Sequence, residues 1–158
     1  MNSCVTSTSA FDLAHAIIIA AISHATLERV IVLLRDMNAY TYNPNANVED
    51  LLLAHPVEAS SVVNHVLETA GVTLSNFTTY ITDVLSILES ITAINFYVTF
   101  TPRLEFKRKI HKEIIRLYGY RSLNIIQDDA LVFGFALSVD GKYMDYSLKS
   151  YFSKLSHV

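Results

Sequence analysis

The chain has 158 residues, of which 51% are hydrophobic and 17% charged, and its formal net charge is −3. This composition excludes an intrinsically disordered protein and leaves room for one domain or two small ones. The longest apolar run near the N-terminus, 16–22, falls short of the roughly 20 residues that span a bilayer, so we interpret it as a buried helix.

The N-terminal region offers no signal for export or for disulfide bonding. A signal or transit peptide carries early positive charge, but the first basic residue here is Arg29, so we expect no targeting segment. Cys4 is the single cysteine, which excludes an intrachain disulfide and is compatible with a reducing compartment.

Charge is divided unevenly along the chain. Residues 1–92 hold two basic and nine acidic side chains, a net charge of −7, whereas residues 93–158 hold ten basic and six acidic side chains, a net charge of +4. The spacing of apolar residues changes from helical to strand-like at the same place. We therefore predict an α+β protein with a helical bundle domain at 1–92 and a small α+β domain at 93–158.

The first part carries apolar side chains at helical spacing, in two stripes: Leu27, Val30, Ile31 and Leu34, then Leu74, Phe77, Ile81, Val84, Leu88 and Ile91. We expect about five helical segments, with breaks at Thr26, at 42–45, at Pro56 and near Gly71. Thr26 is expected to cap one helix, and Pro56 to be the first residue of another. Because such helices bury their stripes only against each other, the sequence predicts an antiparallel helical bundle.

The second part begins with a predicted strand, 93–100, which is rich in β-branched and aromatic residues. Thr101-Pro102 then predicts the cap and first turn of an amphipathic helix at 103–118, and Gly119 predicts its end. Its apolar face holds Phe106, Ile110, Ile114 and Leu117, and the rest is strongly basic. A second strand is expected at 121–127.

The last thirty residues predict a hairpin that leads into a short helix. An apolar run at 131–139 ends at Asp140-Gly141, a dipeptide that tolerates the positive φ angles of a two-residue turn. Asp145 or Ser147 is expected to cap the final helix, whose apolar positions are Leu148, Tyr151, Phe152 and Leu155. The complete order of the second domain is then β-α-β-β-β-α.

Catalytic, metal and nucleotide sites find little support in the sequence. The histidines show no metal-ligand spacing: His15, His24, His55, His65, His111 and His157. The glycines are too scattered for a phosphate-binding loop: Gly71, Gly119, Gly134 and Gly141. Asp128-Asp129 could act as an acid-base pair, but adjacent carboxylates before a strand favour a solvated turn. We expect no cofactor, no bound metal and no catalysis.

The basic run 106–112 leaves a nucleic-acid-binding module as an alternative, because a positive helix beside a sheet can bind phosphates. The whole chain is acidic, however, and Glu105, Lys109 and Glu113 have the i,i+4 spacing of an ordinary exposed face. A protein partner or a solvated face is the preferred explanation of the pattern. A stand-alone helical adaptor is a third interpretation.

From about Val98 onward, the order of these elements resembles the delta subunit of F-type ATP synthases, called the oligomycin-sensitivity-conferring protein in mitochondria. That family has a Thr-Ala-x-Leu segment, an amphipathic helix, a strand, an acidic residue, a Leu-x-Gly-Gly-Phe-like strand, a turn, and Asp-x-Ser before the last helix. The matching positions here are 101–104, Asp128 or Asp129, 131–135 and 145–147. Upstream, Asn76-Phe77 is similar to an Asn-Phe-Leu segment of the family's helical domain.

Three features of the sequence depart from the family pattern. Phe133 stands in place of the first glycine of the pair, and Thr101-Pro102 replaces Thr-Ala. The stretch between Asn76 and Ala93 is also short for the two helices that the family places there. The resemblance therefore implies a shortened helical domain.

The resemblance implies a structural stator subunit that takes part in ATP synthesis and proton transport without an active site or small-molecule substrate. The helical domain of the family binds the amphipathic N-terminal helix of the alpha subunit, and the C-terminal domain binds the peripheral stalk. Such a subunit lies on the cytoplasmic face of a bacterial membrane, or on the matrix side of the mitochondrial inner membrane, and meets the membrane only through the complex.

Partner-binding residues can be suggested by the same analogy. For the alpha subunit they are His15, Ile18, Ile19, Ile22, Phe77 and Ile81, and for the stalk they are Lys107, Arg108 and Lys112. Core packing is the alternative role for the isoleucines and Phe77. A solvated helix face is the alternative for the three basic residues.

Overall fold

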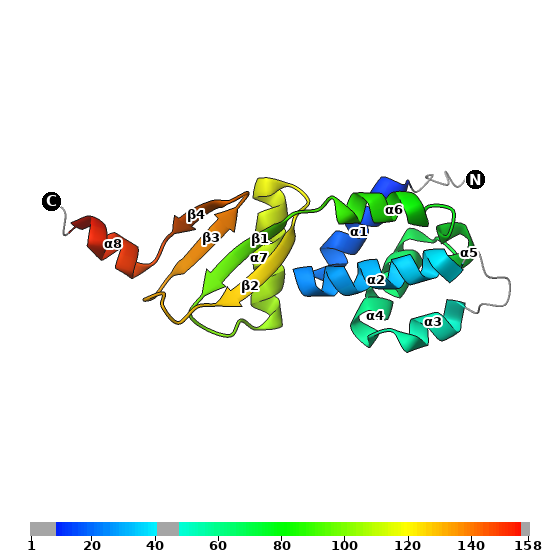
Figure 1. Ribbon diagram of the computed structural model, residues 1–158, viewed down its shortest axis with the longest axis horizontal. Helices are drawn as coiled ribbons and strands as arrows, with labels where there is room; N and C mark the ends of the chain where they lie inside the picture. Colours follow the sequence, from blue (N-terminus) through cyan, green and yellow to red (C-terminus); the bar gives the residue numbers. More distant parts are fainter. Residues whose placement is uncertain (1–8, 41–47, 156–158) are drawn as a thin grey trace, which may run out of the picture. The chain divides into compact units, whose positions relative to one another are not determined.

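The computed structural model describes residues 9–40 and 48–155, and it contains helices together with a four-stranded mixed sheet (Figure 1). This composition is consistent with the predicted α+β class. The described residues divide into two compact units. The first unit contains the described residues 9–21, 26–40 and 48–91. The second unit contains 22–25 and 92–155.

The first unit is helical and has its own apolar core. Helix α1 packs against α4 and α6, and the side chains that it buries include Leu13, Ile17 and Ile18. Its elements are α1 (Ala10–Ala21), α2 (His24–Tyr40), α3 (Val48–Ala54), α4 (Val57–Ala70), α5 (Leu74–Phe77) and α6 (Ile81–Glu89). The first two residues of α2, His24 and Ala25, are assigned to the second unit.

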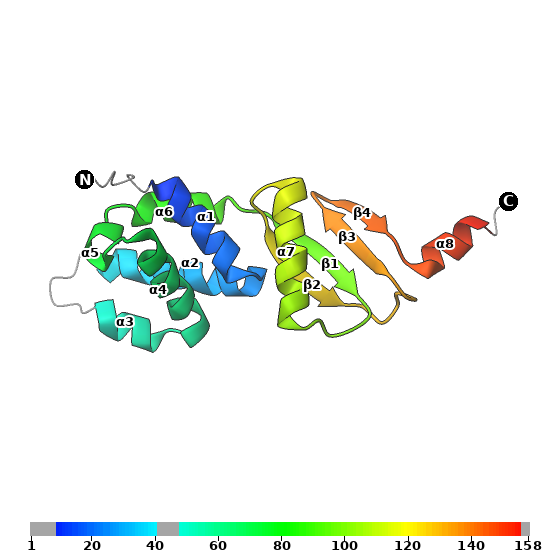
Figure 2. The same cartoon turned by 180° about the vertical axis from the view of Figure 1, so that it is seen from behind.

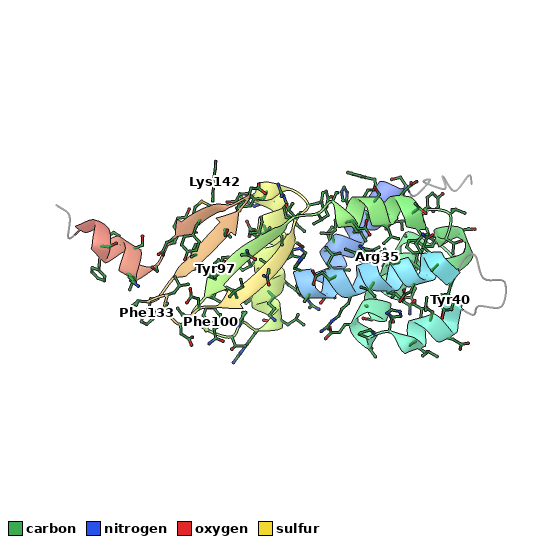
Figure 3. The ribbon with its side chains drawn as sticks, in the orientation of Figure 1. Arg35, Tyr40, Tyr97, Phe100, Phe133 and Lys142 are labelled. Carbon is green, nitrogen blue, oxygen red and sulfur yellow. The ribbon has the colours of Figure 1, made fainter. Side chains whose placement is uncertain are left out.

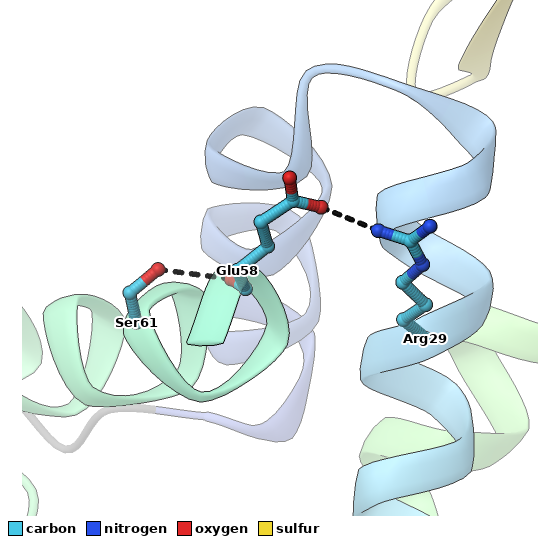
Figure 4. A network of polar contacts seen from close by, with 3 residues as sticks. All are labelled: Arg29, Glu58 and Ser61. Carbon is cyan, nitrogen blue, oxygen red and sulfur yellow. Dashed lines mark hydrogen bonds and ion pairs between the residues drawn. The ribbon is translucent and has the colours of Figure 1, made fainter. Parts of the chain in front are cut away.

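A surface ion pair joins α2 to α4 in this unit. The guanidinium of Arg29 donates to the carboxylate of Glu58, and Ser61 Oγ donates to the Glu58 carbonyl oxygen over 2.9 Å (Figure 4). Both charged side chains are more than half exposed. Such pairs contribute only about 0–1 kcal/mol, so the buried apolar side chains stabilise the unit far more than this contact does.

Two of the predicted helix starts are wrong. Thr26 lies inside α2, because the chain reverses earlier, at Ile22, whose φ of 57° is incompatible with a continuing helix. Pro56 has an extended ψ of 133° and precedes the first helical residue, Val57. The predicted break at Gly71 is confirmed, since Gly71 ends α4 with a left-handed φ of 65°. The break predicted at 42–45 lies outside the described residues.

The predicted apolar helix over 74–91 is interrupted. A turn separates α5 from α6, in which the Tyr80 N–H bonds to the Phe77 carbonyl and Thr79 Oγ1 donates to the Asn76 carbonyl over 2.6 Å. These i,i+3 bonds replace the helical i,i+4 pattern. The apolar stripe survives the turn, because Phe77 and Ile81 on either side are both buried.

The second unit has the element order β-α-β-β-β-α. Its strands form a sheet in the order β2-β1-β3-β4, in which β1 is parallel to β2 and antiparallel to β3, and β4 is antiparallel to β3. The bounds are β1 (Ala93–Val98), α7 (Leu104–Tyr118), β2 (Ser122–Gln127), β3 (Phe135–Val139), β4 (Lys142–Asp145) and α8 (Leu148–Leu155).

Helix α7 covers one face of the sheet, as the two opposite views show (Figures 1 and 2). Ile94, Phe96 and Val98 of β1 are buried in one cluster with Ile114 of α7. Because strand side chains alternate between faces, Asn95 and Tyr97 lie on the opposite face. Figure 3 shows Tyr97 on that face.

The expected turn chemistry of the hairpin is present. Asp140 and Gly141 have φ angles of 49° and 79°, so both adopt the left-handed conformation that joins β3 directly to β4. The Arg121 guanidinium donates to both carboxylate oxygens of Asp140, over 3.1 and 3.3 Å. This pair fixes the turn to the start of β2.

The two predicted caps of the second unit differ in outcome. Ser147 caps α8, because its Oγ accepts the Ser150 N–H over 3.3 Å, and Asp145 Oδ1 accepts the Ser147 N–H over 2.8 Å. Thr101 does not cap α7, because its hydroxyl donates to Gln127 Oε1 over 3.0 Å and the helix begins later, at Leu104.

The segments 132–135 and 145–148 cross at very close range. Phe133 and Gly134 have φ angles of 49° and 97°, and a Cβ atom on Gly134 would lie 2.5 Å from the carbonyl oxygen of Tyr146. No L side chain fits there without moving one of the two backbones.

Replacing Gly134 with alanine should therefore destabilise the protein by roughly 2–3 kcal/mol, since strain in φ is added to a backbone clash. The matched control is Gly71→Ala, where φ is also positive but nothing lies within 4 Å, and which should cost about 1 kcal/mol. Urea unfolding measures both variants. Equal destabilisation of the two would show that the close crossing does not exist.

Candidate interaction surfaces

The residues suggested for alpha-subunit binding do not lie on one surface. Ile18, Phe77 and Ile81 are at most 1% exposed and belong to the core of the first unit, as the core-packing alternative predicts. His15 is also buried, and Ile22 is half-buried and belongs with the second unit. These five side chains therefore offer little surface to a partner.

Ile19 is the exception, because it is 53% exposed, and a second exposed apolar residue that was not among the suggested ones lies on the same helix. Phe11 is 57% exposed and lies eight residues earlier, about two helical turns away on the same side of α1. The i,i+8 spacing of two large apolar residues was the signal that could have identified it.

The start of α1 is held by a reciprocal cap. Ser9 donates its N–H and its hydroxyl to Asp12 Oδ2, over 3.1 and 2.7 Å, and Ser9 Oγ accepts the Asp12 N–H over 3.2 Å. Two bonds hold the pKa of Asp12 below its ordinary value: the bond from the Ser9 hydroxyl has the larger effect, and the bond from the Ser9 N–H has the smaller one. Burial lowers the pKa of His15, and the Asp12 charge opposes that effect. The cap thus fixes the exposed end of α1 that carries Phe11.

The three basic residues suggested for the stalk are also separated by the structure. Arg108 and Lys112 are exposed one turn apart, whereas Lys107 is half-buried. Among the described residues, no salt bridge involves any of the three. Glu113, which has i,i+4 spacing to Lys109, accepts a bond from Arg116 Nε over 2.7 Å instead.

The predicted apolar face of α7 is only partly buried. Leu117, which the periodicity places on the buried face, is 60% exposed. Phe106 and Ile110 lie on the same flank and are half-buried, as is Met144 of β4, while Phe135 of β3 is exposed. We call these five residues the α7 strip.

Three apolar positions of α8 are likewise exposed. Leu148, Tyr151 and Phe152 have large accessible side chains, although Ser147 at the base of the helix is buried. The spacing correctly predicted an amphipathic helix. The spacing does not predict that these three side chains stay exposed in the described part of the chain.

His111 is buried in α7 and faces the start of β2. Its Nε2 atom lies 3.3 Å from the carbonyl oxygen of Arg121, which can only accept, so the proton of the neutral ring is on Nε2. Burial lowers the pKa of His111, and the bond to the Arg121 carbonyl partly opposes this effect.

Asp128 and Asp129 form the solvated turn that the sequence favours. Asp128 Oδ1 accepts the Ala130 N–H over 2.9 Å, and Asp129 Oδ1 accepts a bond from Gln127 Nε2 over 3.2 Å. Both carboxylates are used to shape the loop that precedes β3.

Among the residues that the structure describes, no group of three or more His, Cys, Asp or Glu side chains could hold a metal ion. None of the described helices combines the length and apolar character needed to cross a bilayer. No protein-family model matches the chain, and no curated protein matches it.

The burial of His111 makes stability depend on pH. The folded pKa lies below the ordinary value of 6.5, so the unfolded chain binds the proton more readily. The stability contributed by neutral His111 is complete above pH 6.5 and is lost as the pH falls towards and through the folded pKa.

We expect His111→Gln to reduce the loss of stability between pH 7.5 and pH 5.5, as measured by urea unfolding at both values. His65→Gln, at an exposed position of α4, is the matched control and should keep the wild-type pH dependence. Identical pH dependence in all three proteins would contradict this role of His111.

Proposed function

We propose that this chain is a structural stator subunit of a rotary F-type ATP synthase, of the delta or oligomycin-sensitivity-conferring type. The helical unit would bind the N-terminal helix of an alpha subunit, and the second unit would bind the peripheral stalk. The chain would then lie at the cytoplasmic or matrix face of the membrane as part of the complex, with the catalytic sites on other chains.

The crossing of 132–135 with 145–148 is the observation that carries this proposal. The family has two glycines where this chain has Phe133 and Gly134, and both residues here have the positive φ angles that glycine adopts most readily. Gly134 supplies the close backbone approach to Tyr146. The backbone conformation typical of a glycine pair is thus present although the first glycine is not.

The Asp-x-Ser segment supports the same proposal. Asp145 and Ser147 accept two successive backbone bonds at the start of α8, so the residues that carry the resemblance have a physical role in this chain. The residues of the segment are therefore required by the local structure, as is expected of a motif that recurs in a family.

The exposed surface of α1 suits a helical partner. Phe11 and Ile19 can bury apolar area against an amphipathic helix at roughly 25 cal/mol per Å². The net charges of −7 on 1–92 and +4 on 93–158 would orient different partners on the two parts of the chain. A clamp of this kind needs two binding surfaces and no catalytic group.

Co-expression with the alpha and stalk subunits of the source organism tests the proposal. The full chain should co-purify with both, and a chain lacking 93–158 should retain the alpha subunit and lose the stalk subunit. Ile19→Asp should weaken alpha-subunit binding by about tenfold or more, as the loss of a central apolar contact does. Val32→Asp, at another exposed position of the first unit, should not.

Two results would contradict the stator role. The first is a full chain that binds neither subunit. The second is binding of nucleic acid that weakens steeply with salt and is lost when Lys107, Arg108 and Lys109 are all changed to alanine, which would favour the nucleic-acid-binding alternative.

A further inference from the structure

The face of the sheet opposite to the α7 strip carries two tyrosines in contact. Tyr97 of β1 lies there because its neighbours in the strand belong to the cluster beneath α7, and Tyr143 of β4 lies there because Met144 joins the same cluster. The two ring centroids are 5.7 Å apart, and the ring planes meet at 64°. Tyr143 is 55% exposed, so much of its ring surface is open to solvent. The rings therefore form two walls at a steep angle to each other.

A carboxylate lies in the same row of the sheet as one of these rings. Tyr97 pairs with Ala136 of β3, and Ala136 pairs in turn with Asp145 of β4. Tyr143 lies two residues before Asp145 and hence on the same face. Ala136 is fully buried although its methyl group is the shortest side chain of the row, so larger side chains around it close over it.

Two carboxylates bring negative charge to the rings. The pKa of Tyr143 is raised, first by burial and then by the charges of Asp145 and Asp128, which oppose a further negative charge on the ring oxygen. Backbone bonds hold both carboxylates in place. Asp145 Oδ1 accepts the Ser147 N–H over 2.8 Å. Asp128 Oδ1 accepts the Ala130 N–H over 2.9 Å. We call Tyr97, Tyr143, Asp145 and Asp128 the tyrosine site.

The tyrosine site is negative, although residues 93–158 carry a net charge of +4. The four strands that the structure describes hold one basic residue, Lys142, which alternates with Tyr143 and so lies on the α7 side of the sheet; Figure 3 shows it extending from the edge. His24 meets the tyrosine face only at its other end, where Nδ1 lies 2.9 Å from Ser122 Oγ. Ser122 begins β2, about 13 Å along the strands from Tyr97.

A methylated ammonium group matches the tyrosine site better than other cations do. Aromatic ring faces attract cations, and nearby carboxylates strengthen the attraction. A guanidinium is held best by two parallel bonds to one carboxylate, but one oxygen of each carboxylate here already accepts a backbone N–H. A trimethylammonium group donates no hydrogen bonds and needs only ring faces and negative charge.

We propose that the tyrosine site binds a small quaternary ammonium compound of the choline type. The rest of the ligand is neutral, because Asp145 and Asp128 repel an added carboxylate or phosphate, as in glycine betaine or phosphocholine. The Kd is about 1–10 mM, since the tyrosine site has two rings and is open to solvent. The stator role neither requires nor excludes such a ligand, so the two proposals can fail separately.

Titration of the full chain with choline, followed by NMR, tests the proposal. Choline should shift the ring signals of Tyr97 and Tyr143. The matched control is the neutral analogue of choline in which carbon replaces the charged nitrogen, because it keeps the shape and loses the charge. This analogue should bind at least about fivefold more weakly than choline. Glycine betaine and phosphocholine should also bind more weakly than choline.

Variants locate the binding. Tyr143→Leu removes a ring and should weaken choline binding by about fivefold or more, whereas Tyr143→Phe keeps the ring and should stay within about twofold of the wild type. Asp145→Asn removes the charge but keeps an oxygen that can accept the Ser147 N–H, and it should weaken binding by about threefold or more. Tyr151→Leu, at another exposed tyrosine, should leave the affinity unchanged.

Several results would overturn the proposal. They are equal affinity for choline and its neutral analogue, no shifts at about 50 mM choline, shifts confined to other residues, or unchanged affinity in Tyr143→Leu or Asp145→Asn. A peptide containing trimethyllysine that binds at least about tenfold more tightly than choline would also overturn it, because the ligand would then be a modified protein. None of these results bears on co-purification with the ATP synthase subunits, which tests the stator role alone.

Discussion

The burial of one face of β1 is the interaction on which the second unit depends. Ile94, Phe96 and Val98 lie in the cluster beneath α7, and both β2 and β3 pair with this strand. A shift of one residue in register would move all three side chains to the opposite face, so the burial of one face also fixes the pairing. A single helix, α7, supplies the cover, and Leu137 and Val139 of the neighbouring strand β3 are buried in the same cluster.

The close crossing of 132–135 with 145–148 connects the start of α8 to the sheet. The Tyr146 N–H bonds to the Phe135 carbonyl over 2.9 Å, and the Leu148 N–H bonds to two carbonyls in 132–133, each over 3.1 Å. The base of α8 is therefore fixed to the sheet, although Leu148, Tyr151 and Phe152 remain exposed. Phe133 and Gly134 adopt positive φ angles at this crossing.

Local chemistry explains what the sequence could predict. The Asp140-Gly141 turn, the Ser147 cap and the Gly71 helix end each follow from the backbone angles or hydrogen bonds of a few adjacent residues. Most strands and helices of 93–155 also lie within two residues of their expected bounds, because alternation and helical periodicity are strong there. The first hairpin strand is the exception: it was expected over 131–139 but begins at Phe135, because Phe133 and Gly134 have positive φ angles that no strand adopts.

Tertiary contacts explain what the sequence could not predict. The reversal at Ile22 and the turn between α5 and α6 do not follow from any local signal in the chain. Periodicity predicts the apolar side of α7, which includes Leu117, but it does not predict which of these side chains other elements bury, and Leu117 is 60% exposed. For the same reason, Phe77 was offered as a contact residue although it is fully buried, and the exposed Phe11 was missed.

Site-specific photo-crosslinking in the intact ATP synthase of the source organism tests the stator account most directly. A photoreactive amino acid would replace Phe11 in one variant and Leu117 in another, both at exposed positions. The account predicts that the Phe11 variant crosslinks to the alpha subunit and the Leu117 variant to the stalk subunit. A purified complex that lacks this chain, or crosslinks from both positions to neither subunit, would contradict it.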